Sequence, residues 1–258
     1  MKLFNAGSLI TEDAIRNLLA ISGDEDKLRA TLTQAKKALL AMYHVSGYGL
    51  PEDFATHPYI LASNHLTDID APLLMAYYYE VLHGEQNEYP RLFTFAKENC
   101  FNGVSVPKEM VPVLEFENTH SVDRTSKSGS TTAMRAAARW YKGAGGPKHF
   151  LIFAQGTIYD INKEAPEDIE TGAFWLSAYL NIPVLPVFIE QTVEGMENRV
   201  VFGTPFQVER DCRDYAPYKQ EWLARVIGAQ DSLAGLTGTP ARDACLDADH
   251  QVRKRHMR

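Results

Sequence analysis

Residues 59–74 read YILASNHLTDIDAPLL, in which an apolar segment is followed by a short polar stretch and then by a second apolar segment. The first segment, residues 59–63, has the aromatic and aliphatic composition of a buried strand. The second opens residues 71–82, APLLMAYYYEVL, which we predict to be a helix. A strand that leads directly into a helix begins an α/β unit, and the polar residues lie at the junction.

Strand-like and helix-like segments continue to alternate through the middle of the chain. Strands are predicted at residues 59–63, 92–96, 112–116, 149–154, 184–189 and 199–203. Helices are predicted between them at residues 71–82, 130–142 and 171–180. Strands separated by helices require crossover connections. The sequence therefore predicts an α/β fold with a largely parallel central sheet flanked by helices.

The two ends of the chain have different patterns. Residues 11–22 and 26–43 carry apolar residues at helical spacing, and Thr11 is a suitable N-cap for the first segment. We predict an N-terminal helical hairpin within residues 1–50, followed by an α/β domain at residues 51–210. The pattern weakens afterwards, so residues 211–258 are predicted to be a C-terminal extension that is partly disordered.

The charge of the chain restricts its partners. The 258 residues have a formal net charge of −7, which argues against general nucleic-acid binding. Residues 91–148, however, contain nine Lys or Arg residues and only five Asp or Glu residues. This basic middle suits an acidic ligand, such as a phosphate head group, coenzyme A or an acidic carrier protein. A solvated charged surface is the alternative explanation.

Cysteine content and hydropathy indicate where the protein acts. The three cysteines, Cys100, Cys212 and Cys245, lack metal-ligand spacing and are typical of a reduced, cytoplasmic protein. The N-terminal residues lack the continuous apolar core of a signal peptide. No apolar run approaches the roughly 18 residues of a membrane-spanning helix. We expect a cytoplasmic protein that at most contacts the inner face of the membrane peripherally.

His65 and Asp70, five positions apart at the strand–helix junction, form a candidate acid–base pair. A carboxylate that is hydrogen-bonded to one imidazole nitrogen fixes the tautomer and makes the other nitrogen a better base. Such a base can accept a proton from the hydroxyl of a substrate, so no serine or cysteine nucleophile is needed. Two alternatives exist: a helix-capping aspartate beside an incidental histidine, or a metal site that also includes Asp68.

Asn64, His65 and Asp70 match the N-H-x-x-x-x-D block of the glycerolipid acyltransferase family, which includes the lysophosphatidic acid acyltransferases. The sequence resembles this family in three further blocks that occur in the same order. LFTFAKENCF followed by VPVLEFENTHSVDR, which ends at Arg124, resembles the second block. FAQGTI (153–158) stands where the third block, F-P-E-G-T-R, is expected, and the proline-bearing GAFWLSAYLNIPVLPVFIE (172–190) resembles the fourth.

The resemblance implies an O-acyltransferase in which His65 is the general base and Asp70 orients it. The base deprotonates an acceptor hydroxyl, which attacks the acyl thioester of coenzyme A or of acyl carrier protein, without a further cofactor or a metal. Backbone N–H groups around Gly156 and Thr157 are suited to the developing oxyanion or to the acceptor. The candidate substrate-binding residues are Asn64, Lys97, Arg124, Lys127, Gln155, Gly156 and Thr157.

The third block departs from the family pattern at both charged positions. Gln155 stands in place of the glutamate and Ile158 in place of the arginine, two positions that the family uses to hold glycerol phosphate. Because an arginine–phosphate contact is charge-assisted and often bidentate, its loss should weaken a phosphorylated acceptor. We therefore expect a neutral or amino-bearing hydroxylated lipid, or a specialised metabolite. A glycerol-phosphate acceptor held mainly by Arg124 is the alternative.

Two other functions are compatible with the same residues. An acyl-thioester hydrolase would use His65 to activate water, although the chain has no G-x-S-x-G motif for a serine nucleophile. A non-catalytic protein that binds a lipid or a carrier would explain the altered third block. Release of acyl groups with and without an acceptor distinguishes the three functions.

Overall fold

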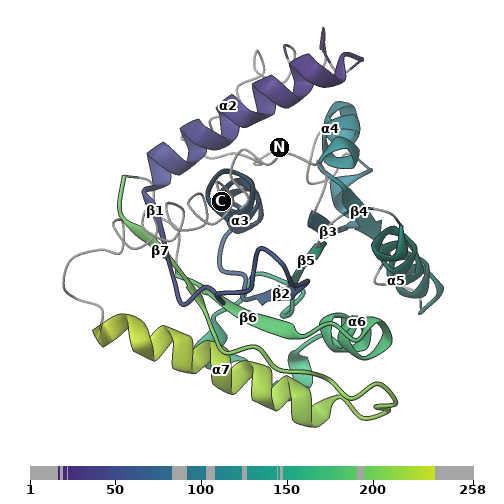
Figure 1. The fold of residues 1–258 in the computed structure, drawn as a ribbon, viewed down its shortest axis with the longest axis vertical. Helices are drawn as coiled ribbons and strands as arrows, with labels where there is room; N and C mark the ends of the chain where they lie inside the picture. The colour runs from purple at the N-terminus through teal and green to yellow at the C-terminus, as the bar shows by residue number, and fades with distance from the viewer. Residues whose placement is uncertain are drawn as a thin grey trace.

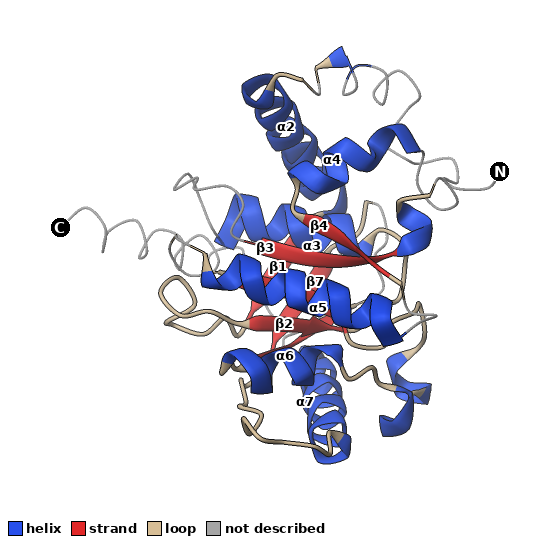
Figure 2. Ribbon diagram, turned by 90° about the vertical axis from the view of Figure 1, so that its right-hand side faces the viewer, coloured by secondary structure: helices blue, strands red, loops and turns tan. Residues whose placement is uncertain are grey.

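The computed structural model describes residues 17, 20, 21, 23–82, 92–102, 108–123, 127–143, 145, 148–190 and 195–235. In these residues a twisted sheet lies between two layers of helices (Figures 1 and 2). No described helix combines the length and the apolar character needed to cross a lipid bilayer.

The described sheet has seven strands in the order β1-β7-β6-β2-β5-β3-β4. These are β1 (Val45–Tyr48), β2 (Ile60–Ser63), β3 (Leu92–Lys97), β4 (Thr119–Val122), β5 (His149–Phe153), β6 (Val184–Ile189) and β7 (Asn198–Phe202). Neighbouring strands are parallel, except that β6 and β7 are antiparallel. The predicted α/β fold with a largely parallel sheet is confirmed.

Helices cover both faces of the sheet (Figure 2). One layer contains α2 (Glu25–Tyr43), α3 (Asp70–Tyr77) with its π-helical continuation η1 (Tyr78–Leu82), and α4 (Val111–Phe116). The opposite layer contains α5 (Lys127–Lys142), α6 (Gly172–Leu180) and α7 (Ala216–Gly235). Each layer packs on its own apolar cluster of buried side chains. Both faces of the sheet are therefore covered, as expected for parallel strands with near-continuous apolar sequences.

The N-terminal helix α2 confirms the second helix of the predicted hairpin, whereas most of residues 11–22 lies outside the described residues. Asp24 caps α2 by accepting the backbone N–H of Lys27. A buried ion pair joins α2 to the segment between α4 and β4, because Lys36 Nζ lies 2.8 Å from Glu117 Oε2. The same ammonium group lies 4.2 Å from the centre of the Tyr79 ring. The buried positive charge of Lys36 is thus compensated by groups of the same helical layer.

The predicted strand at residues 112–116 is wrong: these residues belong to α4. Pro112 lies in the first turn of α4, where a missing N–H costs nothing. The short apolar run could not be distinguished from a strand by its periodicity. The strand next to β3 is β4 instead, with Thr119 opposite Thr94.

Besides β4, strand β1 and helix α7 were not predicted from the sequence. Strand β1 pairs with β7 at the edge of the sheet. Helix α7 lies in the segment assigned to a C-terminal extension, and its Trp222 is fully buried. The Trp222 indole donates a hydrogen bond to the carbonyl of Ala62 in β2, at 2.9 Å. Residues 216–235 therefore pack on the central sheet, whereas residues 236–258 lie outside the described part of the chain.

We expect Trp222→Phe to lower the free energy of unfolding by about 1–3 kcal/mol, because it removes a buried hydrogen bond and leaves unfilled space. Urea denaturation followed by circular dichroism measures this change. Tyr179→Phe, on the half-exposed surface of α6, is the matched control and should change stability little. Equal stability of Trp222→Phe and the wild type would contradict the packing of α7 on β2.

Candidate active site

The loops that leave β2, β5 and β6 meet at the carboxyl end of these central parallel strands, which we call the carboxyl edge of the sheet. Strand β2 lies between β5 and β6, and Ser63 at its end is opposite Phe153 and Val187. Because the three strands are parallel, their carboxyl ends lie side by side. Crevices outside the carboxyl ends of such strands are the usual ligand sites of open α/β sheets. Asn64 and His65 follow β2 at this edge.

His65 and Asp70 form the hydrogen-bonded pair that their spacing suggested. His65 Nδ1 lies 3.1 Å from Asp70 Oδ2. Asp70 is the first residue of α3 and is fully buried, whereas the His65 side chain is 19% exposed. A carboxylate on Nδ1 stabilises the proton there and leaves Nε2 as the proton acceptor. The pair can therefore serve as a general base that is accessible from solvent.

Further hydrogen bonds hold the Asp70 carboxylate in place. Oδ2 accepts the backbone N–H groups of Leu66 at 2.6 Å and Thr67 at 2.8 Å. Oδ1 accepts the hydroxyl of Thr67 at 2.6 Å. The His65 ring packs against Phe153, with ring centres 4.3 Å apart. Both partners of the pair are thus positioned by contacts from the β2–α3 turn and from β5.

Asn64, a predicted substrate-binding residue, is fully buried beside β6. Its Nδ2 donates to the carbonyl of Ile189 at 2.9 Å, and its Oδ1 accepts the N–H of Ile189 at 2.7 Å. These bonds use both ends of the amide to join the ends of β2 and β6. The geometry favours a positioning role for Asn64 over contact with a substrate.

Gln155, another predicted substrate-binding residue, is also buried. Its Oε1 accepts the backbone N–H of His65 at 2.7 Å. Its Nε2 donates to the carbonyl of Tyr159 at 3.1 Å and to Glu164 Oε2 at 2.7 Å. The side chain therefore connects the loop after β5 to the backbone of His65, the candidate base, and its amide is directed at protein groups.

Gly156 and Thr157 lie in the turn that follows β5. Gly156 has a φ of +67°, a conformation that favours glycine, and its N–H donates to the carbonyl of Phe153 at 2.9 Å. Thr157 is exposed, and within the described part of the chain its N–H donates to no protein acceptor. Of the two predicted oxyanion donors, Thr157 is therefore the better candidate.

Two of the three predicted anion-binding residues, Lys97 and Lys127, lie at or near the carboxyl ends of the parallel strands. Lys97 is the last residue of β3 and is exposed. Lys127 is the first residue of α5, and Arg124 lies outside the described residues. Asp68 is exposed, and the described residues contain no group of His, Cys, Asp and Glu that could hold a metal ion. Asp68 thus lies on the surface, whereas Asp70 is buried and pairs with His65.

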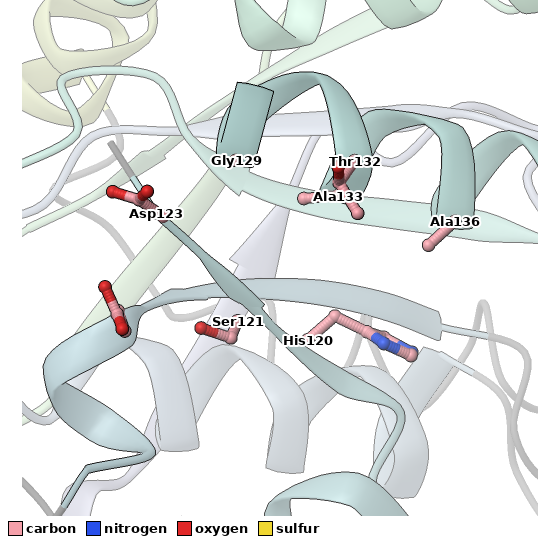
Figure 3. Close-up of a pocket in the computed structure, with 8 residues that line it drawn as sticks. His120, Ser121, Asp123, Gly129, Thr132, Ala133 and Ala136 are labelled. Atoms are coloured by element: carbon pink, nitrogen blue, oxygen red, sulfur yellow. The ribbon is translucent and has the colours of Figure 1, made fainter. Parts of the chain in front are cut away.

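A cavity of about 410 Å³ lies between β4 and the first half of α5 (Figure 3). It is lined by Glu98, His120, Ser121, Asp123, Gly129, Thr132, Ala133 and Ala136. Glu98 and Asp123 follow β3 and β4, so they belong to the carboxyl edge of the sheet. No described Lys or Arg lines the cavity.

Sequence reasoning missed Glu98 and His120 as lining residues, although both lie within the second block. Burial lowers the pKa of His120, which favours its neutral form. Its ring stacks on Phe93 with centres 4.1 Å apart, and its Nε2 lies 2.8 Å from Asn118 Oδ1. The two carboxylates that line the cavity belong to Glu98 and Asp123. The signal available for Glu98 was its position just after the predicted strand at residues 92–96, whereas no predicted strand included or preceded His120 closely enough to single it out.

Comparison with known proteins identifies the fold and the family of this chain. No curated protein sequence matches the chain. Its fold is similar to the crystal structure of PlsC, the 1-acyl-sn-glycerophosphate (LPA) acyltransferase from Thermotoga maritima, with a TM-score of 0.53 and 16% sequence identity. The match covers 85% of this chain and 88% of that one. A family model described as Acyltransferase matches residues 26–190, which contain His65, Asp70 and Gln155. Because this match spans more than half of the chain, the protein belongs to the acyltransferase family, as its N-H-x-x-x-x-D motif predicted.

Proposed function

We propose that the protein transfers a fatty acyl group from an acyl thioester to a hydroxyl of a lysolipid or a related acceptor. The observation that carries this proposal is the His65–Asp70 pair, with Nδ1 3.1 Å from the buried carboxylate and the ring partly exposed. Membership of the acyltransferase family supports the same reaction class. The likeness to PlsC supports the fold on which the pair is placed.

In this reaction His65 Nε2 accepts the proton of the acceptor hydroxyl while the oxygen attacks the thioester carbonyl. The resulting oxyanion needs a hydrogen-bond donor, for which the Thr157 N–H is the candidate. Collapse of the intermediate breaks the carbon–sulfur bond, and the imidazolium returns the proton to the departing thiolate. Asp70 stabilises the imidazolium between these two steps. The products are an acyl ester and a free thiol.

The acyl donor is coenzyme A or acyl carrier protein, both of which are anionic. Exposed Lys97 at the carboxyl end of β3 is a candidate contact for either one. The basic composition of residues 91–148 supports an anionic donor near this edge. A cytoplasmic location, with peripheral contact to the inner face of the membrane, is part of the same proposal because a lysolipid acceptor resides there.

The acceptor is proposed to be a hydroxylated lipid or metabolite without a phosphate group. Ile158, which replaces the arginine of the family motif, is 41% exposed at the catalytic edge. The cavity between β4 and α5 presents carboxylates from Glu98 and Asp123 at the carboxyl ends of β3 and β4. Carboxylates repel phosphate and attract an amino group. These observations support a neutral or amino-bearing acceptor, with Arg124 as the residue that would hold a phosphorylated one.

Replacing His65 with alanine should lower acceptor-dependent thiol release from acyl-CoA by about 10²–10⁴, the usual contribution of a general base. Release is followed with a thiol reagent, using medium-chain and long-chain acyl-CoA and acyl carrier protein as donors. The matched control is His57→Ala, which removes an exposed histidine whose partner is Asp53 on the surface. Release that depends on His65 but not on an acceptor would identify a thioesterase instead.

Wild-type protein should acylate a monoacylglycerol or an amino-bearing lysolipid without phosphate faster than lysophosphatidic acid. Ile158→Arg should raise the rate with lysophosphatidic acid roughly 10- to 100-fold, because a charge-assisted hydrogen bond contributes about 1.5–3 kcal/mol. Product analysis by thin-layer chromatography measures both effects. Ile158→Gln, which adds a polar group without charge, is the control. A clear preference of the wild type for lysophosphatidic acid would refute the proposed acceptor class.

A further inference from the structure

The backbone of His65 is held on both sides by the segment that follows β5. Its N–H donates to Gln155 Oε1 at 2.7 Å, and its carbonyl accepts the N–H of Tyr159 at 2.9 Å. The next two N–H groups, those of Leu66 and Thr67, donate to Asp70. Three consecutive N–H groups are therefore bound by side chains, the first by Gln155 and the others by the catalytic carboxylate.

The orientation of the Gln155 amide decides whether its oxygen can face His65. The two groups around Nε2 are the carbonyl of Tyr159 and the carboxylate of Glu164, and both can only accept hydrogen bonds. They require the NH₂ end of the amide and leave Oε1 for the N–H of His65. Glu164 makes the shorter of these two bonds, at 2.7 Å, and it carries the only charge among them.

Glu164 is itself held firmly. It follows the 3₁₀ turn η4 (Ile161–Lys163), and its backbone N–H donates to the carbonyl of Ile161. The Ile161 side chain is buried in the apolar cluster beneath α6 and α7. Asp160 caps the turn by accepting the N–H of Asn162 at 3.1 Å. A chain of contacts thus runs from the core through Glu164 and Gln155 to His65.

We propose that Glu164, which lies outside all four sequence blocks, is a positioning residue for acyl transfer. By orienting the Gln155 amide it keeps the His65 backbone in the place that the His65–Asp70 pair requires. This inference rests on the proposed function for its kinetic consequence only. It also explains the departure at residue 155: a glutamate there would set one carboxylate against Glu164 and would lose the donor to Tyr159.

The test uses Glu164→Ala, Glu164→Gln, Gln155→Glu and the exchanged pair Gln155→Glu/Glu164→Gln. Glu167→Gln, an exposed glutamate of the same loop, is the matched control. Values of kcat and KM are measured with long-chain acyl-CoA and with whichever of lysophosphatidic acid and a monoacylglycerol the wild type uses faster. Thermal unfolding reports whether each variant is folded.

We expect Glu164→Ala and Gln155→Glu to lower kcat by about 10- to 100-fold with little change in the KM for acyl-CoA, since a small misplacement of a catalytic group costs up to about 10² in rate. Glu164→Gln should retain activity because its amide oxygen still accepts from Gln155. The exchanged pair should recover much of the activity of Gln155→Glu, because the amide then donates in the opposite direction. Folded Glu164→Ala with wild-type kcat, or an exchanged pair no better than Gln155→Glu, overturns the inference.

Amide hydrogen exchange measured by NMR tests the same inference without any substrate. In Glu164→Ala the His65 N–H should exchange faster, whereas the N–H groups of Leu66 and Thr67 should stay protected by Asp70. Unchanged exchange at His65 overturns the inference even if transfer is observed. Inactive wild-type protein with faster exchange at His65 in Glu164→Ala would refute the proposed function and support the positioning role.

Discussion

The buried carboxylate of Asp70 is the group on which the site depends. It accepts hydrogen bonds from two backbone N–H groups, one hydroxyl and the His65 ring. An ionised carboxylate without such donors would be costly at full burial. Because Asp70 also begins α3, its negative charge lies at the favourable end of that helix. One side chain thus holds both the turn before α3 and the ring of the candidate base.

The parallel sheet supplies the second constraint, since it brings distant segments to one edge. Asn64 joins the ends of β2 and β6, and Gln155 joins the loop after β5 to the turn after β2. Both residues belong to motifs that suggested substrate binding, and both are buried with their amides directed at protein groups. Polar residues of a family motif can therefore serve to hold the backbone around the candidate base His65.

The departures at residues 155 and 158 have different physical consequences. Gln155 is an internal change, because the amide is satisfied by three protein partners and pairs with the carboxylate of Glu164. Ile158 is an external change, because the side chain lies at the exposed rim where an acceptor would approach. The first alters how the turn that carries His65 is held, and the second alters the charge of the exposed surface beside it. A buried polar contact to the His65 backbone and an exposed apolar side chain thus occur within one short loop.

Local sequence alone determined the α/β class, most strands and helices, the family and the His65–Asp70 pair. These features depend on periodicity and on short spacings that any reader of the chain can measure. The sequence could not distinguish α4 from a strand, and it did not indicate that α7 would bury Trp222 against β2. Only the tertiary structure decided that Asn64 and Gln155 face inward and that Glu164 meets Gln155. The reason is that hydrogen-bond partners such as Asn64 and Ile189 are brought together by sheet pairing, which no local pattern records.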